Sequence, residues 1–233
     1  SITITTLNST GTLVLDGSAV TIGQTISQSD IVGGALTFTP LANDNGVGYD
    51  SFNFTVSDGQ ADSPSQASMT IDVASQNDAP TATDATVSAT EDTPYVFVPS
   101  DFGFTDADAT DVLQGITVTT LSSTGTLELN GSSVTVGQSI SHDDIFAGAL
   151  TFTPLANNNG VAYDSFTYTV NDGVAESIAS VTMKIDVAAV NDLPSGTDNT
   201  IIATEDTPYI FVSSNFGFID VDKSDQLQSI TFA

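Results

Sequence analysis

The sequence contains no cysteine, arginine or tryptophan, and its only basic side chains besides His142 are Lys184 and Lys223. Without cysteine, no disulfide can stabilise the fold, so a secreted form must rely on other interactions. Two lysines cannot build a cationic face for phosphates, which excludes nucleic acid as a partner and disfavours anionic membrane surfaces. Because no apolar run approaches about 18 residues, we also expect no membrane insertion.

Catalytic motifs are equally scarce. His142 stands where the internal repeat described below has Gln28, so the repeat does not require a histidine at that position. The sequence has no nucleophile elbow and no metal-type histidine spacing. Paired carboxylates hydrolyse glycosides in some enzymes, but here the acidic pairs recur in each repeat and cluster at the junctions. We therefore predict that the protein is not an enzyme.

Acidic residues, in contrast, are abundant, since 29 aspartates and glutamates give the 233-residue chain a net charge of −27. Apolar residues make up 39% of the chain, which is enough for a buried core and argues against disorder. The acidity has two compatible interpretations. Like charge keeps a β-rich chain from associating, and carboxylates are ligands for divalent cations.

The sequence repeats itself without a gap at an offset of 114 residues. SITITTLNSTGTL at Ser1 matches GITVTTLSSTGTL at Gly115, and ATEDTPYVFV at Ala89 matches ATEDTPYIFV at Ala203. An offset of this length corresponds to one ordinary domain rather than to a short solenoid repeat. We therefore expect the C-terminal two thirds of one repeat at 1–79, a complete repeat at 80–193 and the N-terminal third of the next at 194–233.

This division leaves residues 1–76 without the first strands of their repeat, whereas residues 195–233 carry those strands. We expect either a continuous array of repeats or neighbouring molecules that supply the missing strands by β-augmentation. Unpaired sheet edges make an isolated monomer unfavourable.

Alternating apolar and polar residues predict β-strands throughout the chain. Residues 181–187 alternate in this way, and Asn130-Gly131 is one of several turn signals between such runs. About seven short strands per repeat, each with one apolar face, predict an all-β sandwich of two sheets. Only the segments that begin at Ser27 and Ser141 are expected to form a short helical turn.

The acidic residues avoid the predicted strand interiors and cluster at positions that recur in each repeat. These positions are the junctions Asn77-Asp78 and Asn191-Asp192, the pairs Glu91-Asp92 and Glu205-Asp206, the sequences Asp106-Ala107-Asp108 and Asp220-Val221-Asp222, and the turns Asp58-Gly59 and Asp172-Gly173. An Asp-x-Asp spacing lets two carboxylates of one extended loop reach the same point. Because calcium takes six to eight oxygen ligands, several loops must converge at a domain end to bind it. Asp50 and Asp164, by contrast, are expected to cap strands.

This order of motifs resembles cadherin repeats and the cadherin-like, Ig-like tandem repeats of giant bacterial RTX-type adhesins. In cadherins the corresponding motifs are PE, DAD, an aspartate of DxG type and DxNDNxP. The resemblance implies a tandem Greek-key β-sandwich with calcium between successive domains, and it implies metal-ligand roles for Glu91, Asp106 with Asp108, Asp172, and Asn191 with Asp192. The linker here is the shorter NDAP or NDLP, and the cadherin LDRE motif has no clear match, so the number of ions per junction stays open.

From the motifs and the resemblance together we predict calcium at both junctions. The predicted ligands are Asn77, Asp78, Asp106, Asp108 and Asp172 at the first junction, and Glu91, Asn191, Asp192, Asp220 and Asp222 at the second. Asp58 and Glu205, which stand at the positions of Asp172 and Glu91 in neighbouring repeats, are predicted ligands as well. Each motif also has a plainer interpretation as an ordinary turn, linker or polar loop.

The resemblance also implies a structural role. We predict calcium-stiffened extender repeats of a large, secreted bacterial adhesin or extracellular filament at the cell surface. Their partners are neighbouring repeats of the same chain or head-to-tail copies, and other domains bind a cell-surface or glycan target. The alternative is that these repeats themselves recognise a glycan or another copy. The spacer interpretation is favoured because phenylalanine and tyrosine occupy core-like, alternating positions and tryptophan is absent.

Overall fold

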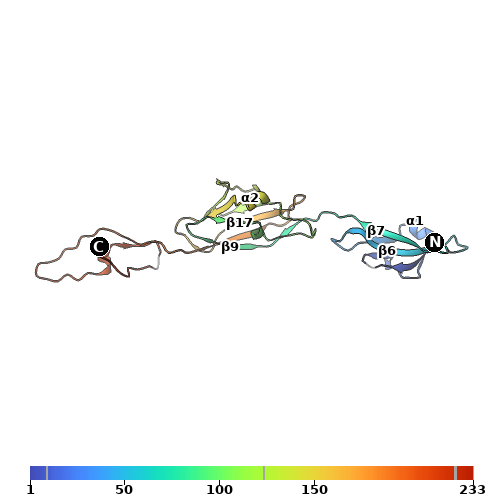
Figure 1. Ribbon diagram of the computed structural model, residues 1–233, viewed down its shortest axis with the longest axis horizontal. Coiled ribbons are helices and arrows are strands. Elements are labelled where there is room, and N and C mark those ends of the chain that lie inside the picture. The colour runs from blue at the N-terminus through green and yellow to red at the C-terminus, as the bar shows by residue number, and fades with distance from the viewer. Residues whose placement is uncertain (9, 123, 223–224, 233) are drawn as a thin grey trace. The chain divides into compact units, whose positions relative to one another are not determined.

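The computed structural model describes residues 1–8, 10–122, 124–222 and 225–232. The chain divides into two compact units, Ser1–Asp78 and Ala79–Ala233 (Figure 1). Lys223 lies outside the described residues. Over the described ranges, no helix combines the length and the apolar character needed to cross a membrane.

The first unit is built from two antiparallel sheets. One sheet has the strand order β4-β1-β6-β7, and the other has the order β3-β2-β5. The single helical turn α1 leads from β4 in the first sheet to β5 in the second. The elements are β1 Ile2–Leu7, β2 Thr12–Leu15, β3 Ser18–Ala19, β4 Thr25–Ile26, α1 Gln28–Val32, β5 Leu36–Thr39, β6 Gly46–Val56 and β7 Ala67–Val73.

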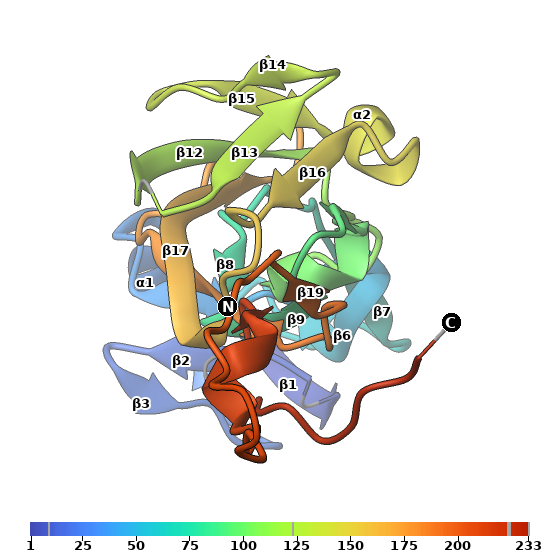
Figure 2. The same cartoon turned by 90° about the vertical axis from the view of Figure 1, so that its left-hand side faces the viewer.

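The second unit contains the same arrangement with more strands. A five-stranded sheet has the order β15-β12-β17-β18-β9, and a four-stranded sheet has the order β10-β16-β13-β14, in which β13 and β16 lie side by side (Figure 2). Strand β9 pairs with β18 in parallel. The elements are β8 Thr81–Ala82, β9 Ala85–Thr90, β10 Tyr95–Val96, η1 Pro99–Phe102, β11 Phe104–Thr105, β12 Gly115–Leu121, β13 Thr126–Leu129, β14 Ser132–Ser133, β15 Ser139–Ser141, α2 His142–Phe146, β16 Leu150–Thr153, β17 Gly160–Asn171, β18 Val181–Ala188, β19 Ser195–Gly196, η2 Ser213–Phe216 and β20 Phe218–Ile219.

The core of the second unit is formed by the inward faces of these strands. Phe166 and Tyr168 are buried on β17. On the neighbouring β18, Met183 and Ile185 are buried whereas Lys184 between them is exposed. Period-two alternation therefore places apolar side chains on one face of each strand, and the predicted all-β, Ig-like sandwich is confirmed.

The turns α1 and α2 begin at the serines that the sequence marked, whereas the 3₁₀ turns η1 and η2 were not expected. Ser27 caps α1, and its hydroxyl accepts a hydrogen bond from the main-chain amide of Asp30. Ser141 caps α2 in the same way through Asp144. Such a serine cap satisfies an amide that the first helical turn leaves without a partner.

Asp164 does not cap a strand as predicted, because it lies inside β17, where its carboxylate binds main-chain amides. Its Oδ2 accepts a 2.6 Å hydrogen bond from the main-chain amide of Gly125, and its Oδ1 accepts one from Ser165. In the first unit Asp50 accepts a 2.8 Å bond from Gly11 in the same manner. Main-chain donors thus satisfy these carboxylates, and neither belongs to the grouped carboxylates described next.

Candidate metal centre

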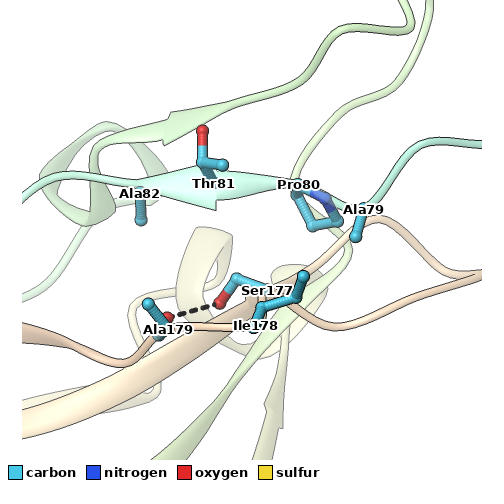
Figure 3. A pocket seen from close by; sticks show the side chains of 7 residues that line it. All are labelled: Ala79, Pro80, Thr81, Ala82, Ser177, Ile178 and Ala179. Carbon is cyan, nitrogen blue, oxygen red and sulfur yellow. Dashed lines mark hydrogen bonds between the residues drawn. The ribbon is translucent and has the colours of Figure 1, made fainter.

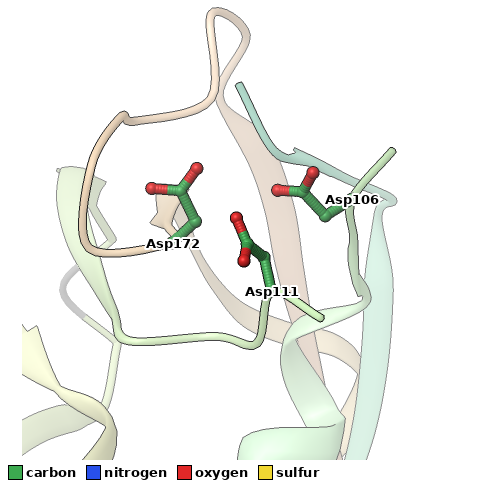
Figure 4. A group of neighbouring side chains, drawn as sticks. All are labelled: Asp106, Asp111 and Asp172. Atoms are coloured by element: carbon green, nitrogen blue, oxygen red, sulfur yellow. The ribbon is translucent and has the colours of Figure 1, made fainter. Parts of the chain in front are cut away.

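Three carboxylates converge at one end of the complete repeat. Asp106 follows β11, Asp111 lies in the loop before β12, and Asp172 follows β17 (Figure 4). Each offers one oxygen, and these oxygens lie within 4.8 Å of one another. The loop is folded tightly, because Oδ1 of Asp106 accepts a 2.9 Å bond from the amide of Asp108, and the carbonyl of Asp108 accepts one of 2.9 Å from Asp111.

Asp172 and Asp106 differ in how their carboxylate oxygens are hydrogen-bonded. Asp172 is buried, and its Oδ1 accepts 2.6 Å bonds from the amides of Val174 and Ala175. Oδ2 of Asp106 is buried as well but has no hydrogen-bond partner. A buried carboxylate oxygen without a partner is unfavourable, and a bound cation would satisfy it.

A second trio lies in the segment that follows the complete repeat. Oxygens of Asp220, Asp222 and Asp225 lie within 4.8 Å of one another. The loop repeats the pattern of the first trio, since Asp220 Oδ1 accepts a 2.9 Å bond from Asp222, and the carbonyl of Asp222 accepts one of 3.0 Å from Asp225. Oδ2 of Asp222 also accepts a 2.8 Å bond from the amide of Asp192, so this loop is tied to the linker.

The surroundings of Asp192 disfavour its negative charge. Its Oδ2 is buried and has no hydrogen-bond partner. Burial raises the pKa of Asp192 above its ordinary value, and the negative charges of Asp92, Asp222, Glu91 and Asp220 raise the pKa further. Carboxylates of the complete repeat, the linker and the following segment therefore act on one group, and without a counter-ion they repel one another.

Glu91 holds the complete repeat's side of the junction. It is buried, its Oε1 accepts a 2.7 Å bond from the amide of Val190, and its Oε2 accepts a 2.9 Å bond from Nδ2 of Asn159. Next to it, Oδ1 of Asp92 accepts a 3.0 Å bond from the amide of Asn157. The Glu-Asp pair thus fixes both the linker and the β16–β17 loop.

The structure brings several of the predicted ligands together. At the second junction, the negative charges of Glu91, Asp220 and Asp222 raise the pKa of Asp192. At the other end of the repeat, Asp106 and Asp172 share one cluster. Asp108 contributes a loop hydrogen bond to that cluster rather than one of its three grouped oxygens.

The other predicted ligands belong to neither trio among the described residues, although Asn191 lines the same pocket as Asp192, Asp220 and Asp225. Asn191 is exposed, and its side-chain amide donates to the carbonyl of Asp192. Asn77 donates in the same way to Asp78, and both belong to the first unit.

Asp58 and Glu205 are both exposed. The main-chain amides of Ala61 and Gln60 donate to the carboxylate of Asp58 and lower its pKa, so that in the described structure this side chain stabilises a turn. Neither Asp58 nor Glu205 belongs to a grouped set of carboxylates among the described residues.

Three acidic residues that were not predicted as ligands lie in or near these clusters. Asp111 and Asp225 each complete a trio, and Asp92 contributes to the field at Asp192. A signal for the first two was present, because Asp111 and Asp225 are separated by the repeat offset. They lie outside the Asp-x-Asp sequence, and only the folded loop brings them to it.

An apolar pocket of about 230 Å³ lies near the start of the second unit (Figure 3). It is lined by Ala79, Pro80, Thr81, Ala82, Ser177, Ile178 and Ala179. Inside this lining, Oγ of Ser177 donates a 3.0 Å bond to the carbonyl of Ala179. No titratable side chain lines the pocket, so it offers no acid, base or metal ligand.

Comparison with protein families gives one match to this architecture. Residues 77–185 match the bacterial Ig domain. The bacterial Ig-like domain is a non-catalytic fold family, and an extender or other structural role is consistent with it. The match begins in the first linker and ends in the middle of β18, so it covers most of the complete repeat.

Comparison with whole proteins adds little. No curated protein matches the chain. Two solved structures are similar, the endo-fucoidan hydrolase MfFcnA4 from glycoside hydrolase family 107 and its H294Q variant, at 22% and 23% identity and TM-scores of 0.29 and 0.28. Each match covers 82% of this chain but only 23% and 24% of the hydrolase chains. At such TM-scores the likeness supports no conclusion about activity.

Proposed function

We propose that the chain is a calcium-stiffened extender in a large, secreted bacterial surface adhesin or extracellular filament. The observation that carries the proposal is the environment of Asp192. Its buried Oδ2 has no hydrogen-bond partner, and carboxylates from the repeat before the linker and from the segment after it raise its pKa. A cation at this point would neutralise groups from two consecutive repeats at once.

Calcium fits the donor set better than a transition metal does. The grouped ligands are all carboxylates, and the chain has no cysteine and a single histidine. Hard oxygen donors select calcium or magnesium, and calcium accepts irregular sets of six to eight oxygens from flexible loops. Carbonyl groups of the loops would supply the remaining oxygens beside Asp106, Asp111 and Asp172 or beside Asp192, Asp220 and Asp222.

Stiffening follows from sharing the ion across the linker. Bound calcium would tie Glu91 and Asp192 to Asp220 and Asp222, so the linker would lose its freedom. Rigid units extend in proportion to their number, whereas flexibly joined units extend only with its square root. Asn77 and Asp78 precede Asn191 and Asp192 by the repeat offset, so the same residue types recur in the earlier linker.

Thermal unfolding of the full chain tests this function. A ligand present at a hundredfold excess over its Kd stabilises the folded state by about 2.7 kcal/mol, which corresponds to a rise in Tm of roughly 5–10 °C. We expect calcium to produce such a rise over chelator, and the double variant Asp220→Asn with Asp222→Asn, which removes two carboxylates that act on Asp192, to lose the part of the rise due to this junction.

The matched control removes the same charge at exposed positions. Asp44→Asn with Asp143→Asn changes two exposed carboxylates outside both trios and should keep the calcium response. An equal loss in both double variants would mean that net charge alone is responsible. If calcium does not change the Tm of the wild-type chain, the proposed function is ruled out.

A further inference from the structure

The first long strand of the complete repeat lies beside the last one. Strand β9 pairs with β18 in parallel, from Ala85 opposite Met183 to Thr90 opposite Ala188. The chain enters this ladder at Ala85, the start of β9, and leaves it at Ala188, the end of β18. Because the strands are parallel, the linker before the repeat and the linker after it are attached to opposite ends of the ladder.

This attachment determines how tension acts on the ladder. A pull on the two linkers drags β9 toward its N-terminal end and β18 toward its C-terminal end, so the strands can separate only by sliding past each other. All main-chain hydrogen bonds of the ladder then carry the load together. Strands that are pulled apart from the same end lose these bonds one after another instead, each at a small cost.

Side-chain carboxylates extend the ladder at both ends. Before β9, Oδ1 of Asp84 accepts a 2.8 Å bond from the main-chain amide of Thr182. After β9, the amide of Glu91 donates a 3.0 Å bond to the carbonyl of Ala188, and Oε1 of Glu91 accepts a 2.7 Å bond from the amide of Val190. Hydrogen bonds to a charged group are stronger than those between neutral groups, so the carboxylates reinforce the ends of the ladder, where the load enters.

The inner face of the ladder is shielded from water. Val87 lies opposite Ile185, and Ala89 lies opposite Val187. All four side chains belong to the buried core of the complete repeat. Sliding of β9 along β18 therefore exposes apolar surface at the same time as it breaks hydrogen bonds, and both effects raise the free-energy barrier to unfolding under load.

We propose that β9 and β18, together with the carboxylates of Asp84 and Glu91, form a mechanical clamp that resists unfolding when the repeat is stretched through its linkers. The clamp gives the fold a load-bearing function, because the complete ladder must slide before the rest of the sandwich can unfold. That the chain carries tension in its natural setting rests on the proposed function, whereas the resistance of the clamp to force does not.

Single-molecule stretching of the full chain in chelator tests the clamp. Since the chain has no cysteine, handles attach only at cysteines introduced for the purpose. Gln76→Cys with Ala189→Cys loads the two strands at opposite ends, whereas Gln76→Cys with Ser180→Cys loads them at the same end, and all three positions are exposed. At the same constant force we expect the second pair of handles to unfold the repeat roughly tenfold faster or more, because fewer hydrogen bonds share the load.

A substitution at one end of the ladder isolates the contribution of a carboxylate. Asp84→Ala removes the bond to Thr182 and should raise the unfolding rate under opposite-end loading by roughly tenfold. Asp164→Ala is the matched control, because Asp164 also accepts a bond from a main-chain amide but does not lie between β9 and β18. The control should lower stability in urea yet leave the unfolding rate under force within about twofold of the wild-type rate.

Equal unfolding rates in the two pulling geometries would overturn the clamp, and so would equal effects of Asp84→Ala and Asp164→Ala under force. If Asp84→Ala does not fold, the comparison of the two geometries with the natural side chains still decides. An unfolding rate that depends on geometry, in a chain whose Tm does not respond to calcium, would support the clamp and contradict the proposed function. A Tm that rises with calcium, without any dependence on pulling geometry, would do the reverse.

Discussion

The main-chain amide of Asp192 donates a 2.8 Å hydrogen bond to Oδ2 of Asp222. This bond joins the linker after the complete repeat to the loop that carries Asp220, Asp222 and Asp225. It places the side chain of Asp192 among carboxylates from both sides, where burial and repulsion raise its pKa. The contact is the structural basis of the calcium-dependent junction that we propose.

Replacing Asp192 with asparagine should have opposite effects with and without calcium. In chelator, Asp192→Asn removes a repelled charge, so we expect a higher Tm than that of the wild type. In calcium it removes a ligand, so we expect the affinity to fall roughly tenfold or more. Calorimetric titration and thermal unfolding measure the two effects. A variant that loses stability equally in both conditions would argue against the site.

Asp164 provides the contrasting case of a structural carboxylate. Asp164→Ala leaves the amide of Gly125 without its 2.6 Å partner, which should cost roughly 1–3 kcal/mol in the free energy of unfolding. The calcium affinity of the folded protein should stay within about twofold of the wild-type value, because Asp164 belongs to neither trio. Denaturant unfolding and calcium titration together check this separation. A large loss of affinity would place Asp164 in the metal centre.

In chelator, the stability of the folded chain should depend on pH through the carboxyl group of Asp192. Its pKa is higher in the folded than in the unfolded chain, so the folded state holds the proton more tightly. The stability gained in this way is fully present below the ordinary value of 3.8 and is lost as the pH rises through the raised pKa. The difference in Tm between Asp192→Asn and the wild type should therefore grow as the pH rises. A difference that stays constant with pH would contradict the assigned pKa direction.

The hydroxyl of Tyr168 makes a buried hydrogen bond in the core of the second unit. It donates a 3.0 Å bond to the carbonyl of Phe102, and the equivalent residue in the first unit, Phe54, has no hydroxyl. We expect Tyr168→Phe to lower the stability of the second unit by about 1 kcal/mol. Tyr163→Phe removes a bond to the exposed amide of Leu155 and should cost less. Urea unfolding measures the loss of stability in both variants. If Tyr163→Phe costs as much stability as Tyr168→Phe, or more, the prediction is wrong.

The fold could be predicted from the sequence because its signals are local. Alternation on β18, the Asn130-Gly131 turn and the serine caps are each set by neighbouring residues. In the structure both Asn130 and Gly131 have positive φ, 52° and 71°, as a tight hairpin turn requires. The repeat added long-range information, since it indicated which distant segments have equivalent positions.

The candidate site was predicted only in part because it depends on loop conformation. Asp106 and Asp172 stood out through their recurring motifs, whereas Asp111 joins them only after the loop folds back through the carbonyl of Asp108. Asp58, the equivalent of the buried Asp172, is exposed and belongs to neither trio among the described residues. Spacing along the chain contains no information on either point.

Hydrogen exchange at the linker tests the central claim most directly. The measurement is the exchange rate of the main-chain amides of residues 189–193 in the full chain, in chelator and in saturating calcium, with β17 as the internal reference. The account predicts that calcium slows exchange in the linker by roughly tenfold or more while β17 stays unchanged. Linker rates that are equal in chelator and in calcium would contradict a calcium-stiffened junction.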